Sequence, residues 1–492
     1  MASMKSNSSV SDNSQDDFNS RPPSEHMIVS TTSTIHNVRV ELSDINSNVP
    51  LSALSLENGE KLGSDQLVFS PVSAVSDIKG KQENDQENNS SNIPPPDKGY
   101  AWVIVVACFL NLMFAFGIFN AFGVFQTYYL TTMFVNESAS KVAWISTICG
   151  TVTFVGGLAA GPIVRRLGLK HTSMLGTIIC FAGLLLASFS DQIWQLILTQ
   201  GLVFGFGSSI IINISLTVPA LWFDKERSLA YGLIASGGGF GALVLIPIVN
   251  KVISASSVHW AFRVLSFIYL VVTGACSFLL KPRIGYTPSD VIIDFKLLRN
   301  PVTIALCIVG FFMQIGYNVP ALYFPSELVK IGISRTKATD YIMVFCTCTA
   351  LSRGISGYAA KHIKPATIMF VCHIITGIIM MAMWYTSSNF GVLMAFYVIL
   401  GFVCIPYLTL GSAVASSYFK PEDVSQVNAL CYLAMGFSAI ISLPSVGAIF
   451  QNVGHRTDYS SIIIIGSVSY FLSGLACIYL RYALKDKPVN PA

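Results

Sequence analysis

The stretch AWVIVVACFLNLMFAFGIFNAFGVFQTY, residues 101–128, contains no charged residue. About 20 consecutive apolar residues are enough for a helix to cross the hydrocarbon core of a bilayer. Lipid offers the backbone no hydrogen-bond partner, so such a stretch must satisfy its N–H and C=O groups within a helix. We therefore interpret residues 101–128 as a transmembrane helix.

Eleven further stretches have the same character, which gives twelve expected spans. They occupy residues 101–128, 142–163, 173–189, 193–222, 228–250, 260–280, 301–323, 341–360, 366–386, 390–418, 424–450 and 461–481. Composition agrees, because the chain is 52% hydrophobic and 11% charged, with a mean hydropathy of +0.60, whereas soluble proteins are about 25% charged. The sequence predicts an all-α polytopic membrane protein.

Residues 1–96 are different, because they are rich in Ser, Asn, Asp and Gln, with Phe18 and Phe69 as their only aromatic residues. Such a segment buries too little apolar surface to offset the entropy of ordering it, so we predict a disordered cytoplasmic tail. It lacks the apolar core and cleavage site of a secretory signal, and the first helix must then direct insertion. Its serines could accept phosphate from kinases, and Lys61, Lys79 and Lys81 could accept ubiquitin; the alternative is a solvated spacer.

Basic residues in the short loops predict the orientation. Lys and Arg gather in the loops after even-numbered spans and at the C-terminus, as in Arg165, Arg166 and Lys170. Positively charged loops stay in the cytoplasm, so both termini are expected there. The sequon at Asn136 then lies in the first outer loop, so close to the membrane that we do not expect its glycosylation.

Several classes of function find no support in the sequence. All eleven cysteines fall inside expected spans, and none has metal-ligand spacing with a histidine, so we expect no disulfide framework, metal site or cofactor. The net charge of +4 gives no argument for nucleic acid. There is no phosphate-cradling loop and no nucleophile paired with a base, which argues against an enzyme or an ATP-driven pump.

The polar segment 281–300 separates two groups of six spans, 97–280 and 301–481, with residues 482–492 as a C-terminal tail. Each group carries a Gly-then-basic turn after its second helix, GPIVRRLGLKH at 161–171 and GYAAKHIKP at 357–365. This repeat fits the major facilitator architecture, in which two six-helix halves rock around a midplane site. The first turn supplies packing and gating candidates, namely Gly161, Arg165, Arg166 and Gly168.

Two further motifs carry a family resemblance. DKGYAW, residues 97–102, resembles the first signature of the monocarboxylate transporter family, and WFDKERSLAYGLIASG, residues 222–237, resembles the second. The resemblance spans 97–481 and is greatest to the fungal branch, which includes riboflavin importers. It implies a carrier of the plasma membrane, with the vacuolar membrane as the alternative. We interpret the signature residues as structural or gating elements: Asp97, Gly99, Trp102, Lys225, Arg227, Gly232 and Gly237.

Apart from Arg481, which ends the last span, two full charges lie inside the spans, Arg263 and Arg353. Arg353 is eight residues before Lys361, or roughly 12 Å along a helix, and an arginine at that depth is costly unless it has a function. The resemblance implies that it holds a substrate carboxylate; the alternative is an arginine that reaches toward the cytoplasm and braces the inner gate. Arg263, near the end of its span, is interpreted as an interfacial anchor.

The chain departs from animal members of the family at proton-handling positions. Asn120 stands where they carry a lysine, Thr349 stands where they carry an aspartate, and no Asp or Glu lies inside any expected span. His373, the sole intramembrane histidine, is either a proton carrier or a packed structural residue. Proton coupling therefore stays open, and facilitated diffusion is equally credible.

Polar and aromatic side chains within the spans are candidates for lining the path. Each can instead form a helix-to-helix hydrogen bond, worth about 0.6 kcal/mol in membranes. With Arg353, the substrate-binding candidates are Asn120, Asn318, Tyr317, Tyr407 and Asn428. Three functions remain: a carrier of a small organic anion, a facilitator of riboflavin or another bulky or uncharged solute, and a non-transporting nutrient sensor.

Overall fold

The computed structural model describes residues 26–29, 38–41, 94–455 and 457–486, and the chain divides into two units, 1–92 and 93–492. Most of the predicted disordered tail and the last six residues of the C-terminal tail lie outside the described residues. In the first unit, β1 (His26–Val29) pairs antiparallel with β2 (Val38–Glu41), and His26 lies opposite Glu41. The sequence did not predict these two strands.

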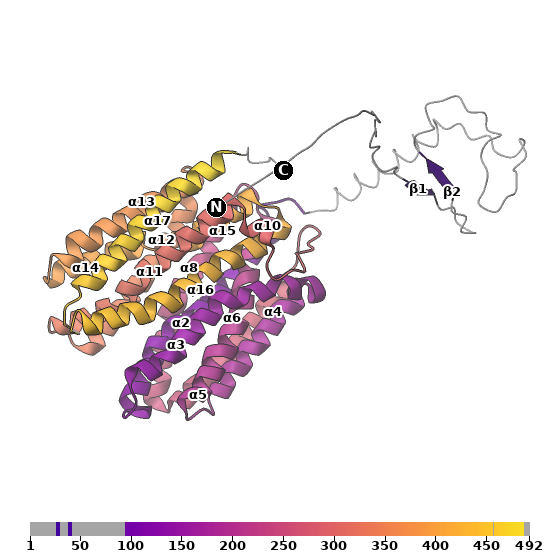
Figure 1. Ribbon diagram of the computed structural model, residues 1–492. Helices are drawn as coiled ribbons and strands as arrows, with labels where there is room; N and C mark the ends of the chain where they lie inside the picture. Colours follow the sequence, from indigo (N-terminus) through magenta and orange to yellow (C-terminus); the bar gives the residue numbers. More distant parts are fainter. Residues whose placement is uncertain (1–25, 30–37, 42–93, 456, 487–492) are drawn as a thin grey trace, which may run out of the picture. The chain divides into compact units, whose positions relative to one another are not determined.

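The second unit is a bundle of helices, and each expected span is helical over most of its length, with a break at residues 404–406 inside the tenth (Figure 1). The first half contains α2 (Tyr100–Tyr128), η3 (Tyr129–Met133), α3 (Ala139–Val155), η4 (Gly156–Ala159), α4 (Ala160–Ala187), α5 (Ile193–Leu196), η5 (Ile197–Val203), α6 (Phe204–Thr217), α7 (Pro219–Trp222), α8 (Arg227–Ala255) and α9 (Val258–Leu279). The second half follows α10 (Phe295–Leu298) and contains α11 (Pro301–Lys330), α12 (Arg335–Ala359), α13 (Pro365–Ile379), η6 (Met380–Tyr385), α14 (Phe390–Val403), α15 (Tyr407–Tyr418), α16 (Pro421–Asn452), α17 (Ser460–Ala483) and η7 (Leu484–Asp486).

Length and apolar composition identify ten candidate spans among the described residues, and two features account for the difference from twelve. The second and third expected spans form one helical run of 47 residues, which is broken at Gly168, where φ is 80° and ψ is 163°. This left-handed backbone is open to glycine at little cost. The eighth expected span is the helix α12, which is not apolar enough to be among the ten because Arg353 and many Ser, Thr and Gly residues lie along it.

The end of α11 differs from the boundary expected from the sequence. The seventh span was expected to end at Tyr323, before Pro325, but α11 continues to Lys330 with Pro320 and Pro325 inside it. A proline inside a membrane helix is tolerated where neighbouring helices satisfy the freed backbone groups. The span as drawn from the sequence contains no acidic residue, but the longer helix includes Glu327, which is buried.

The two halves pack against each other through equivalent helices. In Figure 1 the indigo and magenta helices of the first half lie together, beside the orange and yellow helices of the second. Across the boundary α8 packs on α12, and α3 packs on α16. We call the end of the bundle where segment 281–300 lies the linker end.

Glycines of α8 set how closely the helices approach. A Cβ at Gly241 would lie 2.0 Å from the Met113 carbonyl oxygen of α2, so α8 lies directly against α2 within the first half. Across the halves, a Cβ at Gly232 would lie 2.9 Å from the Cα of Gly357 in α12. Small residues permit this backbone approach, on which helix packing in membranes depends.

Candidate functional site

Arg353 lies on the boundary between the halves, where α12 meets α8. Its side chain is 7% exposed, and its Nη1 donates a hydrogen bond of 2.8 Å to the carbonyl oxygen of Ala235 in α8. Its Nε is buried and has no hydrogen-bond partner. Among the described residues no carboxylate lies within ion-pair distance of this guanidinium, so its charge has no protein counter-ion there.

Asn120 and Arg353 converge on the same segment of α8, although they come from different halves. The Asn120 Nδ2 of α2 donates to the carbonyl oxygen of Gly238 at 3.2 Å, one helical turn beyond Ala235. A Cβ at Gly238 would lie 2.8 Å from the Arg353 Nη1, so the absence of a side chain makes room for the guanidinium. The glycine run thus positions both candidate residues.

Aromatic rings surround this position. The Tyr317 ring of α11 stacks on Phe345 of α12, with centroids 6.2 Å apart. The Tyr432 ring of α16 stacks on Phe154 of α3 at 5.7 Å, across the boundary between the halves. Both phenols are electrostatic neighbours of Arg353. The site therefore combines one buried cation with flat, apolar surfaces.

The other three candidate binding residues form hydrogen bonds between helices. Asn318 accepts from Gln314 and donates to the Ser442 Oγ, both at 2.9 Å. The Tyr407 hydroxyl donates to the Leu306 carbonyl oxygen at 2.8 Å. In this conformation, Asn318 and Tyr407 hold the second half together.

Asn428 instead bridges the two halves. Its Nδ2 donates to the Leu216 carbonyl oxygen of α6 at 3.3 Å. It also lines a small cavity with Tyr407 and Tyr432, which places it on the second half's side of the boundary. Asn428 therefore has a position from which it can respond to movement of one half against the other.

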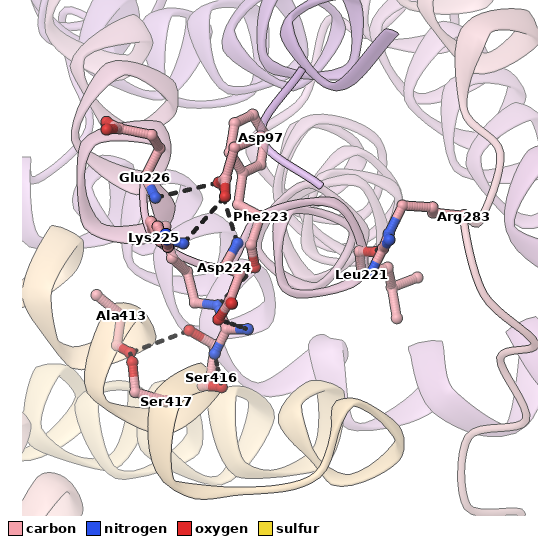
Figure 2. A network of polar contacts seen from close by, with 11 residues as sticks. Asp97, Leu221, Phe223, Asp224, Lys225, Glu226, Arg283, Ala413, Ser416 and Ser417 are labelled. Atoms are coloured by element: carbon pink, nitrogen blue, oxygen red, sulfur yellow. Dashed lines mark hydrogen bonds and ion pairs between the residues drawn. The ribbon is translucent and has the colours of Figure 1, made fainter. Parts of the chain in front are cut away.

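The two signature motifs form a single structure at the linker end, which Figure 2 shows. The Asp97 carboxylate accepts hydrogen bonds of 3.0, 3.1 and 3.1 Å from the backbone N–H groups of Asp224, Lys225 and Glu226. Successive N–H groups of this kind make an anion-binding concavity. The motif before the first helix is therefore fixed to the loop that leads into α8.

Positive φ angles and aromatic contacts shape the first motif. Asp97 has φ 60° and Gly99 has φ 55°, which turns the chain sharply before α2. The Trp102 Nε1 donates to the Asp97 carbonyl oxygen at 3.2 Å, and its ring meets the edge of Phe223 at 5.4 Å. The Lys225 side chain is exposed, and its backbone N–H contacts Asp97.

Residues that follow in the second motif bridge the halves. The Arg227 Nη1 donates to the Ser416 carbonyl oxygen at 2.6 Å, and Glu226 forms an ion pair with Lys361. Nearby, the Asn213 Nδ2 donates to the Ser425 carbonyl oxygen at 3.0 Å. These contacts join the halves at the linker end. Gly237, by contrast, packs within the first half, where a Cβ would lie 2.4 Å from the Phe109 carbonyl oxygen.

The Gly-then-basic segment of the first half lies against the linker. The Arg165 Nη1 donates to the Pro288 carbonyl oxygen at 3.4 Å, and a Cβ at Gly161 would lie 3.6 Å from the Ser289 carbonyl oxygen. Arg166 forms a long, exposed ion pair of 3.9 Å with Asp290, which contributes little to stability. Residues 161–166 therefore contact the linker, and we assign them to packing against it and not to lining the path between the halves.

His373 and Arg263 both lie away from the α8–α12 contact. His373 is fully buried where α13 meets α17, and its Nδ1 lies 3.0 Å from the Ser473 Oγ. Arg263 lies at the end of the bundle opposite the linker, over the rings of Phe189 and Trp260, each centroid 5.1 Å away. Neither residue shares a contact with Arg353 among those described.

Sequence reasoning missed the buried Glu327, whose Oε2 accepts a hydrogen bond from the Trp384 Nε1. The two apolar residues Leu328 and Val329, which follow directly after Glu327, were the signal that could have extended this helix. Sequence reasoning also missed the contact of Asp97 with the loop before α8, because nothing local in either motif indicates the other.

Comparisons with known proteins agree with this architecture. The family model of the Major Facilitator Superfamily matches residues 104–313 and 304–492. The MFS transporter asaE of Aspergillus flavus is 24% identical over 388 residues, which is 77% of this chain and 88% of that protein. The riboflavin transporter MCH5 of Saccharomyces cerevisiae is 24% identical over 435 residues, 81% of each protein.

Solved structures share the fold at low sequence identity. The human organic anion transporter MFSD10 superposes with a TM-score of 0.60 at 12% identity, covering 76% of this chain and all of that one. The proton:xylose symporter XylE superposes with a TM-score of 0.58 at 12% identity, covering 79% and 96%.

Proposed function

The chain belongs to the Major Facilitator Superfamily, and from this premise we propose that it is a secondary transporter that carries a small organic anion by alternating access. The observation that carries the proposal is the buried Arg353, whose Nε has no partner and whose charge has no carboxylate nearby among the described residues. Relatives that cover most of the chain are themselves named transporters.

An anion compensates such a guanidinium better than a neutral solute does. A buried charge without a partner costs several kcal/mol in effective terms. A carboxylate can accept two parallel N–H bonds from the planar fork of an arginine, which adds both energy and orientation. With Nη1 held by Ala235, the Nε side of the fork remains for the solute.

Movement between the halves would expose this site from either end. In the conformation described, the linker end is joined by Arg227 with Ser416, Glu226 with Lys361, and Asn213 with Ser425. Opening at that end requires these few polar contacts to separate. Rocking of two halves around a fixed site is how this architecture exchanges access.

A second candidate solute is riboflavin or another bulky ring compound. The stacked pairs Phe154–Tyr432 and Tyr317–Phe345 favour it, because aromatic surfaces suit flat heterocycles. The similarity to a protein named as a riboflavin transporter also supports this second candidate. In that case the main role of Arg353 is to join the two halves through its hydrogen bond to Ala235, and not to bind the solute.

Uptake of labelled pyruvate, lactate and riboflavin separates these candidates. In cells that produce the chain at the surface, we expect pyruvate or lactate to accumulate above the level in cells without it. Accumulation of riboflavin alone would replace the anion proposal by the second candidate. Accumulation of none of the three, with surface delivery verified, would contradict both.

We further propose that the protein lies in the plasma membrane, with the vacuolar membrane as the alternative, and that both termini are cytoplasmic. The basic loops support this orientation, since Arg165 and Arg283 both lie at the linker end. A tag on either terminus should then be stained only after cells are permeabilised. Staining of a tag on intact cells would contradict the orientation.

A further inference from the structure

Glu327 is the one acidic residue among the buried side chains described, at 9% exposure. It lies in α11, close to the end opposite the linker, and its Oε2 accepts a hydrogen bond from the Trp384 Nε1 of η6. The Trp384 side chain is 1% exposed. The proposed transport function does not use this pair.

The charged and titratable groups around Glu327 do not neutralise it. Those that face it are Lys330 of α11 and Asp458 and Tyr459, which precede α17. Lys330 donates instead to the Thr457 carbonyl oxygen and lies 5.6 Å from the Tyr459 ring centroid. Asp458 binds the N–H and hydroxyl of Ser460, which holds its pKa below the usual value.

Glu327 therefore has a single neutral donor and no ion pair among the described contacts. Burying an ionised carboxylate costs free energy unless it is paired. Its protonation state is therefore expected to depend on whether water reaches the carboxyl group. A tryptophan N–H can donate to a carboxylate or to the carbonyl oxygen of a neutral carboxyl, but the bond to the ion is about twice as strong.

A continuous series of aromatic contacts joins this pocket to the site at Arg353. Trp384 meets Phe324 edge-on at 5.6 Å, and Phe324 stacks on Tyr397 at 4.2 Å. Tyr397 stacks on Phe345 at 4.7 Å, and Phe345 stacks in turn on Tyr317. Packed rings of this kind can transmit a displacement of Trp384 to the neighbour of the arginine.

The helix α11 carries both Glu327 and Tyr317, and it is weakened between them. Pro320 and Pro325 lie between Tyr317 and Glu327 in α11, and each removes a backbone N–H from the helical ladder. Prolines are among the identified causes of helix bending. A bend at these residues would change both the exposure of Glu327 and the position of Tyr317.

We propose that Glu327 is a proton-binding site whose occupancy is coupled to solute binding at Arg353. The Glu327 carboxylate takes a proton from a hydronium ion: one O–H bond of the hydronium breaks and releases water, one O–H bond forms on the carboxyl group, and the negative charge on the group that accepts from Trp384 disappears. The aromatic series and the proline segment convey this change to Tyr317. By reciprocity, a solute that alters the protonation of Glu327 must also bind with an affinity that depends on pH.

Tryptophan fluorescence tests the proton site without any solute. The full chain, purified in lipid nanodiscs, is titrated from about pH 4 to about pH 9, a range that spans perturbed carboxyl groups. We expect an emission step in the wild type that is absent in Trp384→Phe and in Glu327→Gln. Asp458→Asn is the matched control, because it removes a nearby exposed carboxylate while keeping a side-chain oxygen that can accept from the Ser460 N–H, and it should retain the step.

Two outcomes would overturn the proton site: a wild-type emission that does not change with pH, or a step that persists in Glu327→Gln. If Glu327→Gln fails to fold, Glu327→Asp keeps the carboxyl group and should show a displaced step. The coupling rests on the proposed function, so it has a separate readout. The solute found in the uptake panel should displace the wild-type midpoint, and an unchanged midpoint at saturation would reject coupling while leaving transport and the proton site in place.

Discussion

Arg353→Ala should lower the affinity for a carboxylate solute by roughly 10- to 150-fold and nearly abolish its uptake, and Arg353→Lys, which keeps the charge, should raise the half-saturation concentration by less. The Nη1 bond to Ala235 orients the guanidinium, and a lysine ammonium offers neither that fork nor two parallel bonds. A lost charge-assisted pair is worth about 1.5 to 3 kcal/mol, which corresponds to that range of affinity. Concentration-dependent uptake at matched surface levels measures both variants.

Arg263→Ala is the matched control, since this arginine also lies in a span but contacts aromatic rings at the end opposite the linker. It should leave the half-saturation concentration close to the wild-type value. An unchanged half-saturation for a carboxylate in Arg353→Ala would eliminate the anion-binding role. For riboflavin, the Arg353 substitutions should change the rate more than the affinity, and Lys should be tolerated better than Ala.

Gly357→Val should stop transport while leaving the protein folded and delivered to the membrane. A Cβ at Gly357 would lie 2.7 Å from the Cα of Gly232, on the other half, so the clash exists when the linker end is closed. Overpacking of this kind costs about 1 to 3 kcal/mol. Because this cost applies only to the conformation closed at the linker end, it shifts the equilibrium between the two conformations by roughly 5- to 150-fold toward the one open at that end.

Two other glycines supply the comparison. At Gly354, three residues earlier in α12, an added Cβ would meet nothing within 4 Å, so Gly354→Val should transport normally. At Gly241, a Cβ would lie 2.0 Å from a backbone oxygen within the same half, so Gly241→Val should prevent folding and delivery. Uptake together with surface quantification distinguishes the three variants. Normal transport by Gly357→Val would show that the α8–α12 contact does not separate and close during transport.

The sequence was sufficient to predict the bundle but not where each helix ends. Apolar stretches of about 20 residues leave few alternatives to a membrane helix. Their ends are harder to place, because apolar character alone does not show where a helix stops, and α11 continues past Tyr323 and through Pro325 to Lys330. The expected span ended at Tyr323, so Glu327 lay outside it and the buried pair with Trp384 was not foreseen.

For the candidate site, the sequence indicated which polar residues lie within the membrane-spanning helices but not which way their side chains point. Arg353 and Asn120 were both selected, and they meet the same segment of α8. Asn318 and Tyr407 were selected on the same grounds, and they hydrogen-bond other helices of the second half. A helix that is apolar on every side carries no periodic signal to show which residues point toward the path.

The bond between Asp97 and the loop before α8 also has a consequence for the order of assembly. Asp97 and Asp224 are 127 residues apart in the chain, so the ribosome has completed four spans before the three N–H groups that receive this carboxylate exist. The segment before the first helix can therefore form this contact only after the loop that leads into the fifth span has been made. A chain that stops short of residue 226 lacks the Glu226 N–H, and with it one of the three hydrogen bonds that hold Asp97.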